Sequence, residues 1–585
     1  MIGRHQTPRL LSCLLLALSS ALSAEITLPG VLGSNMVLQR DQPVPVWGWG
    51  HPGEKVSVSF GDQTLETTVK DDRSWEATLQ PMPANTEGRT LTVRGSNRIS
   101  LTNILVGEVW ICSGQSNMEW RIRQSMNAKE EAAAANYPLI RLFDVPGRHV
   151  SPVPKRETPG GKWQACTPET VSDFSAVGYH FGRRLHQDLK VPVGLVGSNW
   201  GGTKIEPWTT LEGFKSVSEL SAFSERVEAY TSETKVGGGD PSAIYHAMVH
   251  PLTPFALRGA IWYQGESNGA EGRSYYHKKH ALVNGWRRAF RNDELAFYWV
   301  QLANFQKPNP KPSGGDGWAK VREAQTQALD LPHTGMAVIT DIGAANDIHP
   351  RNKQDVGKRL AQWALHQTYG KKDLVPSGPL YRELKIEGNA IRLSFDHVGS
   401  GLMVGRKEGL TPTQEVKDGQ LKHFAIADRE MNWHWAQATI DGNTVLVRAN
   451  EVPHPVAVRY AYAMNPVGAN LYNREGLPAS PFRTDTWRGP TEQLKWIPLT
   501  KGSPPSSIPG SGTEVSFTNK RPETVHLSWM AYGGGSKRYA SLAPGATHTQ
   551  TTFSKAYWLV TDSKGAPLGY FKTTDKIGIA VIPEG

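Results

Sequence analysis

The feature that most constrains the fold is a short apolar run that ends in a small polar turn. Residues 108–118 read EVWICSGQSNM, so β-branched and aromatic side chains lead to Gly114 and then to Ser116. Such a run predicts a buried parallel strand, and open α/β sheets bind ligands at the carboxyl ends of their strands. We therefore expect Ser116 to stand at the ligand-binding edge of a sheet.

The chain is too long for one hydrophobic core, and its N-terminus has a distinct character. Residues 1–24 carry Arg4 and Arg9, an apolar stretch and a small-x-small ending at Ala24, a pattern typical of a secretory signal peptide. A lipoprotein interpretation through Cys13 is weaker, because most of the apolar residues follow that cysteine. We expect a secreted or periplasmic protein, and no later segment is apolar for long enough to span a membrane.

The pattern of the sequence changes several times after the signal peptide. Short alternating strands come first, strands alternating with helices follow, and β patterns then return. The expected fold class is α/β, with a parallel sheet flanked by helices and accessory β-sandwich domains. The expected segments are a signal peptide at 1–24, an N-terminal β-sandwich at 25–105, a catalytic domain at 106–370, a β-rich domain at 371–488, a linker at 489–512 and a β module at 513–585.

Within the α/β region, apolar residues at three- and four-residue steps predict a helix that Asp173 caps and that runs to Leu189. A second amphipathic helix is expected around residues 356–364. Continuous apolar runs predict further strands at 193–197, 259–263, 297–302 and 336–340.

Charge and cysteine content exclude several function classes. Loss of residues 1–24 removes two arginines and no acid, which lowers the formal net charge from +10 to +8. No basic run is dense enough for a nucleic-acid surface. No His/Cys cluster has metal-ligand spacing and no glycine loop fits a phosphate, so we expect neither metal nor cofactor. Cys112 lies inside the predicted strand, which favours a buried free thiol, although a disulfide with Cys166 stays open.

The chemistry of a serine nucleophile requires a base and donors for an oxyanion. His349 is the natural base, and Asp347 is its candidate orienting acid. The amide of Ser116 itself and a backbone amide of the Gly-Gly turn at 201–202 are candidate oxyanion donors. Asn268, which follows the strand at 259–263, adds a side-chain amide.

The order serine, glycine, asparagine, histidine, each after a predicted strand, is the block order of the SGNH (GDSL-like) hydrolases. The resemblance extends to longer stretches, VWICSGQSNMEW, SNWGGTKIEPW, HPLTPFALRGAIWYQGESN and NDIHPRNKQDVGKRLA, which are similar to the sialate O-acetylesterase family. This resemblance to the sialate O-acetylesterase family extends over roughly residues 25–485. The resemblance implies carboxyl-ester hydrolysis with Ser116 as nucleophile, His349 as base, and the Ser116 amide, Gly202 and Asn268 as oxyanion donors. We choose Gly202 over Gly201.

The acid behind His349 departs from the common pattern. Many SGNH enzymes have it three residues before the histidine, where this chain has Asn346. Asp347 lies two residues before, so in an extended segment its side chain shares a face with that of His349. Asp341, Glu266 or no acid at all are the alternatives.

Other polar and aromatic residues near these motifs have both structural and functional interpretations. Gln264 and Glu266 are expected to brace the loop that holds Asn268. Arg258 and Lys353 either pair with acids, the commoner outcome, or face a substrate carboxylate. One further set is either a sugar-binding platform or buried beside the sheet: Tyr245, His246 and Trp262.

The last seventy residues resemble the β-domain of the von Hippel–Lindau protein, a small β-sandwich whose namesake binds a hydroxyproline-containing peptide. Trp529, Tyr539 and Trp558 match aromatic positions of that pocket. The histidine of the pocket is replaced by Ala556. The module therefore either packs against its neighbours or binds a polymer or a hydroxyproline-rich ligand.

The sequence leads to an exported carbohydrate O-acetylesterase whose partner is an acetylated oligo- or polysaccharide. Nineteen tryptophans and the extra module favour hemicellulose, such as xylan or xyloglucan, over sialic acid. The alternatives are a sialate O-acetylesterase, a carbohydrate-binding protein with a relic hydrolase site, and a lipase, which the absence of an obvious long apolar lid disfavours.

Overall fold

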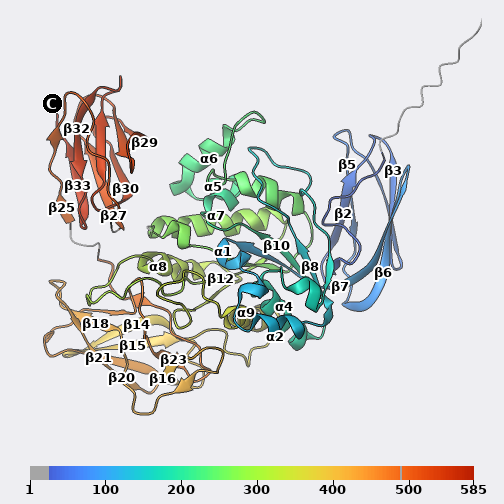
Figure 1. Ribbon diagram of the computed structural model, residues 1–585, viewed down its shortest axis with the longest axis horizontal. Helices are drawn as coiled ribbons and strands as arrows, with labels where there is room; N and C mark the ends of the chain where they lie inside the picture. The colour runs from blue at the N-terminus through green and yellow to red at the C-terminus, as the bar shows by residue number, and fades with distance from the viewer. Residues whose placement is uncertain (1–24, 270, 488–490, 511, 585) are drawn as a thin grey trace, which may run out of the picture.

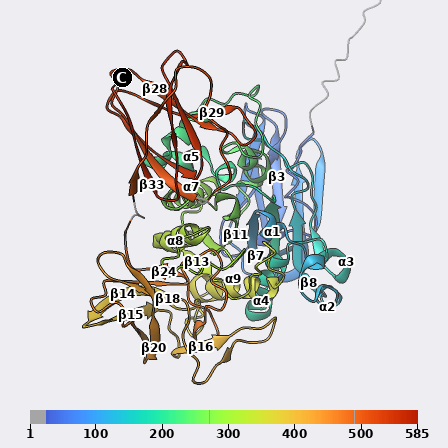
Figure 2. The same ribbon diagram turned by 60° about the vertical axis from the view of Figure 1, so that its left-hand side comes forward.

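The computed structural model describes residues 25–269, 271–487, 491–510 and 512–584. The expected signal peptide therefore lies outside the described residues. Figures 1 and 2 show an α/β domain at the centre, with β-domains arranged around it. In the described part of the chain, no helix has the length and apolar character needed to cross a membrane.

The central sheet has the strand order β13-β12-β11-β7-β10-β8-β9. Its neighbouring strands pair in parallel, except that β9 is antiparallel to β8. The strands are β7 (Arg98–Gly114), β8 (Tyr137–Asp144), β9 (Gln164–Cys166), β10 (Val193–Asn199), β11 (Gly259–Tyr263), β12 (Ala296–Val300) and β13 (Thr334–Ala337). The mostly parallel α/β architecture expected from the sequence is confirmed.

Helices cover both faces of this sheet, which explains why its strands are apolar on both sides. Successive residues of β7 enter different cores: Val109 and Ile111 pack in one, Trp110 and Cys112 in the other. The first core contains residues of α7 and α8, and the second contains residues of α4 and α9. The α-helices are α1 (Ser116–Glu119), α2 (Ala128–Ala133), α3 (Pro168–Val171), α4 (Ala176–Leu189), α5 (Leu211–Lys215), α6 (Ser221–Glu228), α7 (Arg273–Ala289), α8 (Ala319–Gln327) and α9 (Lys353–Trp363).

Short 3-10 and π turns occupy several connections. The 3-10 turns are Ile122–Gln124, Glu206–Trp208, Ser218–Leu220, His250–Leu252, Glu266–Asn268 and Ala328–Asp330, and the π turns are Tyr245–Val249 and Ala364–Thr368.

The predicted boundaries need small corrections. The strand at 259–263 is confirmed, whereas β12 and β13 begin one or two residues earlier than expected. Helix α4 is capped by Ser175, whose Oγ accepts the Gly178 amide at 3.1 Å. Asp173 is not the cap, because its carboxylate pairs with Arg121 and Arg123 on the surface.

The N-terminal β-domain shares a strand with the catalytic sheet. Strand β7 pairs with β6 near its start and with β10 and β11 near its end, so the boundary expected between residues 105 and 106 falls inside it. A single rigid strand thus joins the two domains. The other strands of the N-terminal domain are β1 (Val37–Gln39), β2 (Val44–Trp49), β3 (Lys55–Phe60), β4 (Gln63–Thr68), β5 (Ser74–Leu79) and β6 (Asn85–Arg94).

The β-rich domain after the catalytic domain has three small sheets around its own apolar core. Its strands are β14 (Leu380–Glu387), β15 (Ala390–Asp396), β16 (Leu402–Arg406), β17 (Gln414–Glu415), β18 (Phe424–Ala427), β19 (Trp433–Trp435), β20 (Gln437–Asp441), β21 (Thr444–Arg448), β22 (Ala457–Tyr460), β23 (Leu471–Asn473) and β24 (Phe482–Arg483).

The C-terminal module is a sandwich of two sheets, ordered β25-β33-β27-β30 and β26-β32-β31-β28-β29. The first two strands lie inside the expected linker at 489–512, so that boundary is wrong. They are two- and three-residue edge strands, too short for a visible alternation. The strands are β25 (Thr491–Gln493), β26 (Ile497–Pro498), β27 (Gly512–Asn519), β28 (Val525–Met530), β29 (Ser536–Leu542), β30 (Thr547–Phe553), β31 (Tyr557–Thr561), β32 (Pro567–Lys572) and β33 (Ile577–Ile582).

The two cysteines of the described chain, Cys112 and Cys166, are both buried and free. Cys112 lies in β7 under α4, where a Cβ on Gly178 would come within 2.9 Å of its sulfur. Burial raises the pKa of both thiols, to about 12 for Cys166. They are therefore core residues and not reactive thiols.

Candidate active site

Three strands bring their carboxyl ends to one level at the edge of the central sheet. In the register of the sheet, Gly114 at the end of β7 lies opposite Asn199 of β10 and Tyr263 of β11. The turns that follow these strands carry Ser116, the glycine pair at 201–202 and residues 264–268. Sheet register therefore assembles three of the predicted motifs side by side.

The turn that presents Ser116 requires glycine at position 114. Gly114 has φ +138°, and a Cβ there would lie 2.2 Å from the carbonyl oxygen of Tyr263. The neighbouring backbone is fixed on both sides, because the Gln115 amide donates to Tyr263 and the Trp200 amide donates to Gly114. Ser116 then begins α1 and remains partly exposed.

His349 reaches this turn from the loop between β13 and α9. Its Nε2 lies 2.9 Å from Ser116 Oγ, a hydrogen-bond distance suited to proton transfer. Asn352 caps α9 by accepting the Asp355 amide at 3.0 Å, which fixes where the loop ends. Trp120 stacks on the imidazole, with ring centroids 4.6 Å apart.

Asp347 lies beside the other ring nitrogen of His349. Its Oδ1 is 3.5 Å from Nδ1 and accepts the backbone amide of His349 at 2.9 Å. Burial, followed by the charge of Lys353, lowers the pKa of His349, while Asp347 opposes that shift. Asp341 is committed elsewhere, because both its oxygens accept Arg359 at 2.7 Å.

The two glycines at 201–202 differ in what their amides do. The Gly201 amide donates to Glu119 Oε2 at 2.6 Å, so it is occupied. Gly202 has φ +79°, space around the position of a Cβ, and an amide that bonds to no acceptor among the described residues. The amide of Ser116 is also without an acceptor in the described part of the chain. Both amides can donate to a bound carbonyl oxygen.

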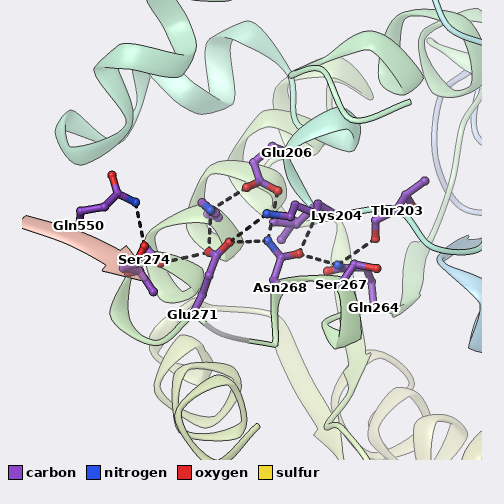
Figure 3. Close-up of polar contacts among 12 residues, drawn as sticks. Thr203, Lys204, Glu206, Gln264, Ser267, Asn268, Glu271, Ser274 and Gln550 are labelled. Atoms are coloured by element: carbon purple, nitrogen blue, oxygen red, sulfur yellow. Dashed lines mark hydrogen bonds and ion pairs between the residues drawn. The ribbon is translucent and has the colours of Figure 1, made fainter. Parts of the chain in front are cut away.

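The structure corrects the expected role of Asn268, shown in Figure 3. Its side chain is buried, and its Nδ2 donates to Glu271 at 2.9 Å and to Glu206 at 3.2 Å. Its Oδ1 accepts the amide of Ile205 at 3.1 Å and Gln264 Nε2 at 2.7 Å. With every hydrogen-bonding group engaged in this way, Asn268 braces the turn at 201–205 and has no donor left for an oxyanion.

A buried ion-pair cluster supports this brace. Lys278 Nζ bonds Glu206 at 2.7 Å and Glu271 at 2.6 Å, and Asn268 bridges the same two carboxylates. Gln264 donates to Asn268 Oδ1 at 2.7 Å, so it braces the loop that holds Asn268, as expected, and it also donates to the Thr203 carbonyl at 3.2 Å.

The remaining polar predictions are resolved by burial and pairing. Arg258 pairs with the buried Glu108 at 2.8 Å, which is the commoner of its two expected outcomes. Glu266 is half-buried and accepts Asn117 Nδ2 at 2.6 Å. Lys353 is buried and donates to Asn117 Oδ1, so it does not face substrate.

Of the two interpretations of the aromatic set beside the sheet, burial is the one that the structure shows, and the sugar platform is wrong. Tyr245, His246 and Trp262 are 7%, 5% and 0% exposed, because the π turn and β11 place them in the core. In the C-terminal module, Trp558 is likewise buried against Phe517, while Tyr539 stays 43% exposed.

Three residues of the site were not predicted from the sequence, although all three lie within four residues after Ser116. Asn117 links the nucleophile turn to Glu266 and Lys353, Glu119 fixes Gly201, and Trp120 supports the imidazole. Their position within VWICSGQSNMEW was the available signal. Among the described residues, no group of three or more His, Cys, Asp or Glu side chains is placed to hold a metal ion.

Comparisons with known proteins identify relatives that are carbohydrate esterases. The family model described as carbohydrate esterase, sialic acid-specific acetylesterase, matches residues 106–366, and the VHL beta domain model matches residues 506–568. The human sialate O-acetylesterase is 30% identical over 500 residues, covering 77% of this chain and 91% of the human protein. The mouse protein of the same name is 29% identical, covering 76% and 92%.

A solved structure extends this similarity to the fold. The crystal structure of a carbohydrate acetylesterase from Xanthomonas citri is 39% identical and superposes with a TM-score of 0.70. The superposition covers 79% of this chain and 100% of the solved chain. Similarity at this level over nearly the whole length of these relatives shows that the chain belongs to the sialate O-acetylesterase family and is a carbohydrate acetylesterase.

Proposed function

We propose that the chain is an exported esterase that removes O-acetyl groups from hemicellulose, such as xylan or xyloglucan, with Ser116 as nucleophile and His349 as base. The observation that carries the catalytic assignment is the 2.9 Å contact between His349 Nε2 and Ser116 Oγ. The unengaged amides of Ser116 and Gly202 beside it support an oxyanion site.

The first half of the reaction forms an acetyl-enzyme. Ser116 Oγ attacks the carbonyl carbon of the acetyl ester while His349 Nε2 takes the hydroxyl proton. The carbonyl oxygen becomes an oxyanion, which the amides of Ser116 and Gly202 stabilise. The bond to the sugar oxygen then breaks, and the imidazolium protonates that oxygen as the deacetylated glycan leaves.

The second half returns the free enzyme. A water molecule attacks the acetyl-serine while His349 accepts its proton, and the same amides stabilise the second oxyanion. Acetate leaves as Ser116 Oγ regains the proton. Asp347 orients the imidazole through Nδ1 and stabilises the positive charge that forms twice in the cycle.

Aromatic surface near the site supports a neutral polysaccharide as substrate. Trp200, one residue before the glycine pair, is partly exposed and lies under the guanidinium of Arg148 at 5.9 Å. Glu119 offsets the charge of Arg148, with a nitrogen–oxygen distance of 3.4 Å. Flat aromatic faces of this kind stack on sugar rings.

A sialate O-acetylesterase activity is the second candidate. The mammalian relatives carry that name, and Arg148 is a cation close to the nucleophile turn, where a sugar carboxylate would need one. Arg148→Ala separates the two candidates. The variant should leave kcat/KM for acetylated xylan nearly unchanged but should raise the KM for O-acetyl sialic acid.

The deciding experiment measures acetate release from acetylated xylan, xyloglucan and O-acetyl sialic acid side by side. We expect kcat/KM to be largest for a hemicellulose and to fall by at least about a thousandfold in Ser116→Ala. Higher activity on sialic acid would reverse the substrate assignment. No acetate from any glycan would favour a binding protein with a relic site, and a preference for long acyl esters would favour a lipase.

For the C-terminal module we propose polymer binding through Tyr539 and its exposed neighbour Tyr532. Trp529 packs edge-on against Tyr532, which holds that ring in place. Binding of the full-length protein to insoluble xylan and to a hydroxyproline-rich peptide tests the proposal. Tyr539→Ala should reduce retention on one of them, and unchanged retention on both would indicate a packing module.

Export rests on residues 1–24, which we propose are a cleaved signal peptide. Expression of the full chain with analysis of the N-terminus of the secreted product tests this assignment. A mature protein that begins at Glu25 is the expected result.

A further inference from the structure

A buried lysine lies directly behind the nucleophile and the base. The side chain of Lys353, at the start of α9, is fully buried and donates to Asn117 Oδ1. The ring centres of Tyr263 and Trp120 lie 5.1 and 5.8 Å from its Nζ. No Asp or Glu among the described residues forms an ion pair with it. Burying an ammonium group in such a place is energetically costly because no anion of the described chain pairs with it.

Asn117 connects this lysine to both halves of the catalytic site. It directly follows Ser116, and its Nδ2 donates to the carbonyl of Ile348, the residue before His349, at 3.1 Å. The same Nδ2 donates to Glu266 Oε1 at 2.6 Å. Lys353 thus anchors, through one amide side chain, the turns that carry the nucleophile and the base.

The charges around His349 are few and can be named. Lys353 lies on the buried side, four residues after His349 at the start of α9, and Asp347 lies at Nδ1. Glu266 stands beyond Asn117, with its Oε2 buried and lacking a partner in the described chain. Glu119 and Arg148, which pair with each other, lie on the side of Ser116 and Gly201. Lys353 is the cation of this set that faces the base from inside the protein.

The energetic consequences follow from burial. Burial lowers the pKa of Lys353 to about 7, against opposing effects of Glu266 and Asp347. Burial raises the pKa of Glu266, although its bond to Asn117 and the charge of Lys353 act in the opposite direction. The lysine is therefore increasingly protonated as pH falls below 7, the range in which a histidine base would otherwise be lost.

We propose that Lys353 is a positioning residue for ester hydrolysis: through Asn117 it aligns Ser116 with His349, and its buried charge keeps His349 unprotonated in mildly acidic solution. The inference rests on the proposed roles of Ser116 and His349. The physical reason is like-charge repulsion, because a proton on His349 would place a second positive charge beside the ammonium of Lys353. Activity is then lost at a lower pH on the acidic side of the profile than it would be with an isolated histidine as base.

Two uncharged variants separate the charge from the hydrogen bond. Lys353→Met keeps the length of the side chain, and Lys353→Gln also keeps a donor for Asn117. We expect the acidic limb of kcat/KM to move up by about half a pH unit or more in both, which is about a threefold loss at the foot of the limb. We also expect Lys353→Gln to retain more of the plateau kcat than Lys353→Met.

A readout independent of catalysis accompanies the kinetics. NMR of 13C-labelled histidines, with His349 assigned by its absence in His349→Gln, reports its pKa directly in wild type and in both variants. A rise in the pKa of His349 without the cation supports the proposal even if the substrate assignment is wrong. An unchanged pKa in a variant that melts like wild type overturns it.

The wild-type protein alone also tests the inference, should neither variant fold. The proposal requires the pKa of His349 in the wild-type protein to lie below 6.5, the ordinary value for histidine. A measured value at or above 6.5 overturns the proposal.

Discussion

The imidazole of His349 stacks on the indole of Trp120, with ring centroids 4.6 Å apart and planes inclined by 18°. This contact leaves Nε2 facing Ser116 Oγ at 2.9 Å and Nδ1 near Asp347 at 3.5 Å. The orientation of the base is therefore shared between a carboxylate and a flat hydrophobic face. A serine hydrolase whose orienting acid is partly exposed gains from such a second support.

Replacing Asp347 should cost less than it does in triads with a buried acid. Asp347→Asn is expected to lower kcat by about a hundredfold, below the ten-thousandfold of a triad whose aspartate alone fixes the tautomer, because Trp120 still holds the ring. Acetate release at saturating substrate measures this. Asp341→Asn is the control, since that carboxylate pairs with Arg359 and should affect stability more than kcat. Equal kcat losses in the two variants would contradict the assignment.

Removing the face under the imidazole should slow the reaction without weakening substrate binding. Trp120→Ala is expected to lower kcat by up to about tenfold, the equivalent of a lost aromatic stack. Trp120→Phe keeps a flat ring and should recover most of the rate. Steady-state kinetics with an acetyl ester, together with melting curves, distinguish this from unfolding. A large rise in KM with kcat unchanged would show that Trp120 contacts substrate instead.

Asn268 should act as a brace and not as an oxyanion donor. Asn268→Ala leaves the Ile205 amide without an acceptor and removes one donor from each of two buried carboxylates, which keep Lys278, so we expect a loss of about 3 kcal/mol in unfolding free energy. The kcat of the folded enzyme should fall by about tenfold through disorder of the turn at Gly202. A loss of a hundredfold or more with unchanged stability would instead identify a direct donor.

A charged replacement at the same site adds a pH test. Asn268→Asp places a third carboxylate beside Glu206 and Glu271, which raises its folded-state pKa above the unfolded value. The destabilisation is present in full above the folded-state pKa and disappears as pH falls below the unfolded value near 4. Denaturant unfolding at pH 5 and pH 8 should show the smaller loss at pH 5.

Two adjacent buried lysines should respond in opposite directions to the same substitution. Lys278 bonds two carboxylates, whereas the amine of Lys279 has no hydrogen-bond partner in the described chain and lies 5.2–5.5 Å from the ring centres of Trp262, Tyr275 and Trp299. We expect Lys279→Met to raise the unfolding free energy by about 1–3 kcal/mol, and Lys278→Met to lower it by about 3 kcal/mol.

The effect of Lys279 should also depend on pH. Burial holds the pKa of Lys279 well below its ordinary value, so the unfolded chain binds a proton that the native protein does not. Wild-type stability therefore gains as pH rises toward the unfolded value near 10, and the advantage of Lys279→Met shrinks over the same range. An advantage that grows with pH would indicate that the amine is charged in the native state.

Much of the site was predictable because local sequence reports local structure. Apolar runs ending in small residues marked the strands β7, β10 and β11, and the residues after each run were the correct place to look for chemistry. Ser116 and His349 lie together as expected. The edge strands β25 and β26 were missed because two or three residues carry no periodicity, and their pairing is decided by β32 and β33, far along the chain.

Composition was a poor guide to which side chains meet substrate. Trp262 was a candidate for a sugar platform and Trp558 matched an aromatic position of the von Hippel–Lindau pocket, yet both are buried, because an aromatic residue fills a core as readily as it contacts a ligand. Asn268 stood in the right motif for an oxyanion donor, but two carboxylates and two N–H donors, half of them from the turn at 205–206, use all of its hydrogen-bonding groups.

The sequence by itself determined the strand–turn units, the glycine that allows the nucleophile turn, and the identity of the serine and the histidine. Only the tertiary structure decided that the Gly201 amide is bonded while that of Gly202 has no acceptor among the described residues, that Asp341 is committed to Arg359, and that Lys353 lies behind the base. The reason is that backbone conformation follows from neighbours in the chain. Burial, pairing and hydrogen-bond occupancy depend on side chains that only the fold brings together, here from 18, 82 and 236 residues away.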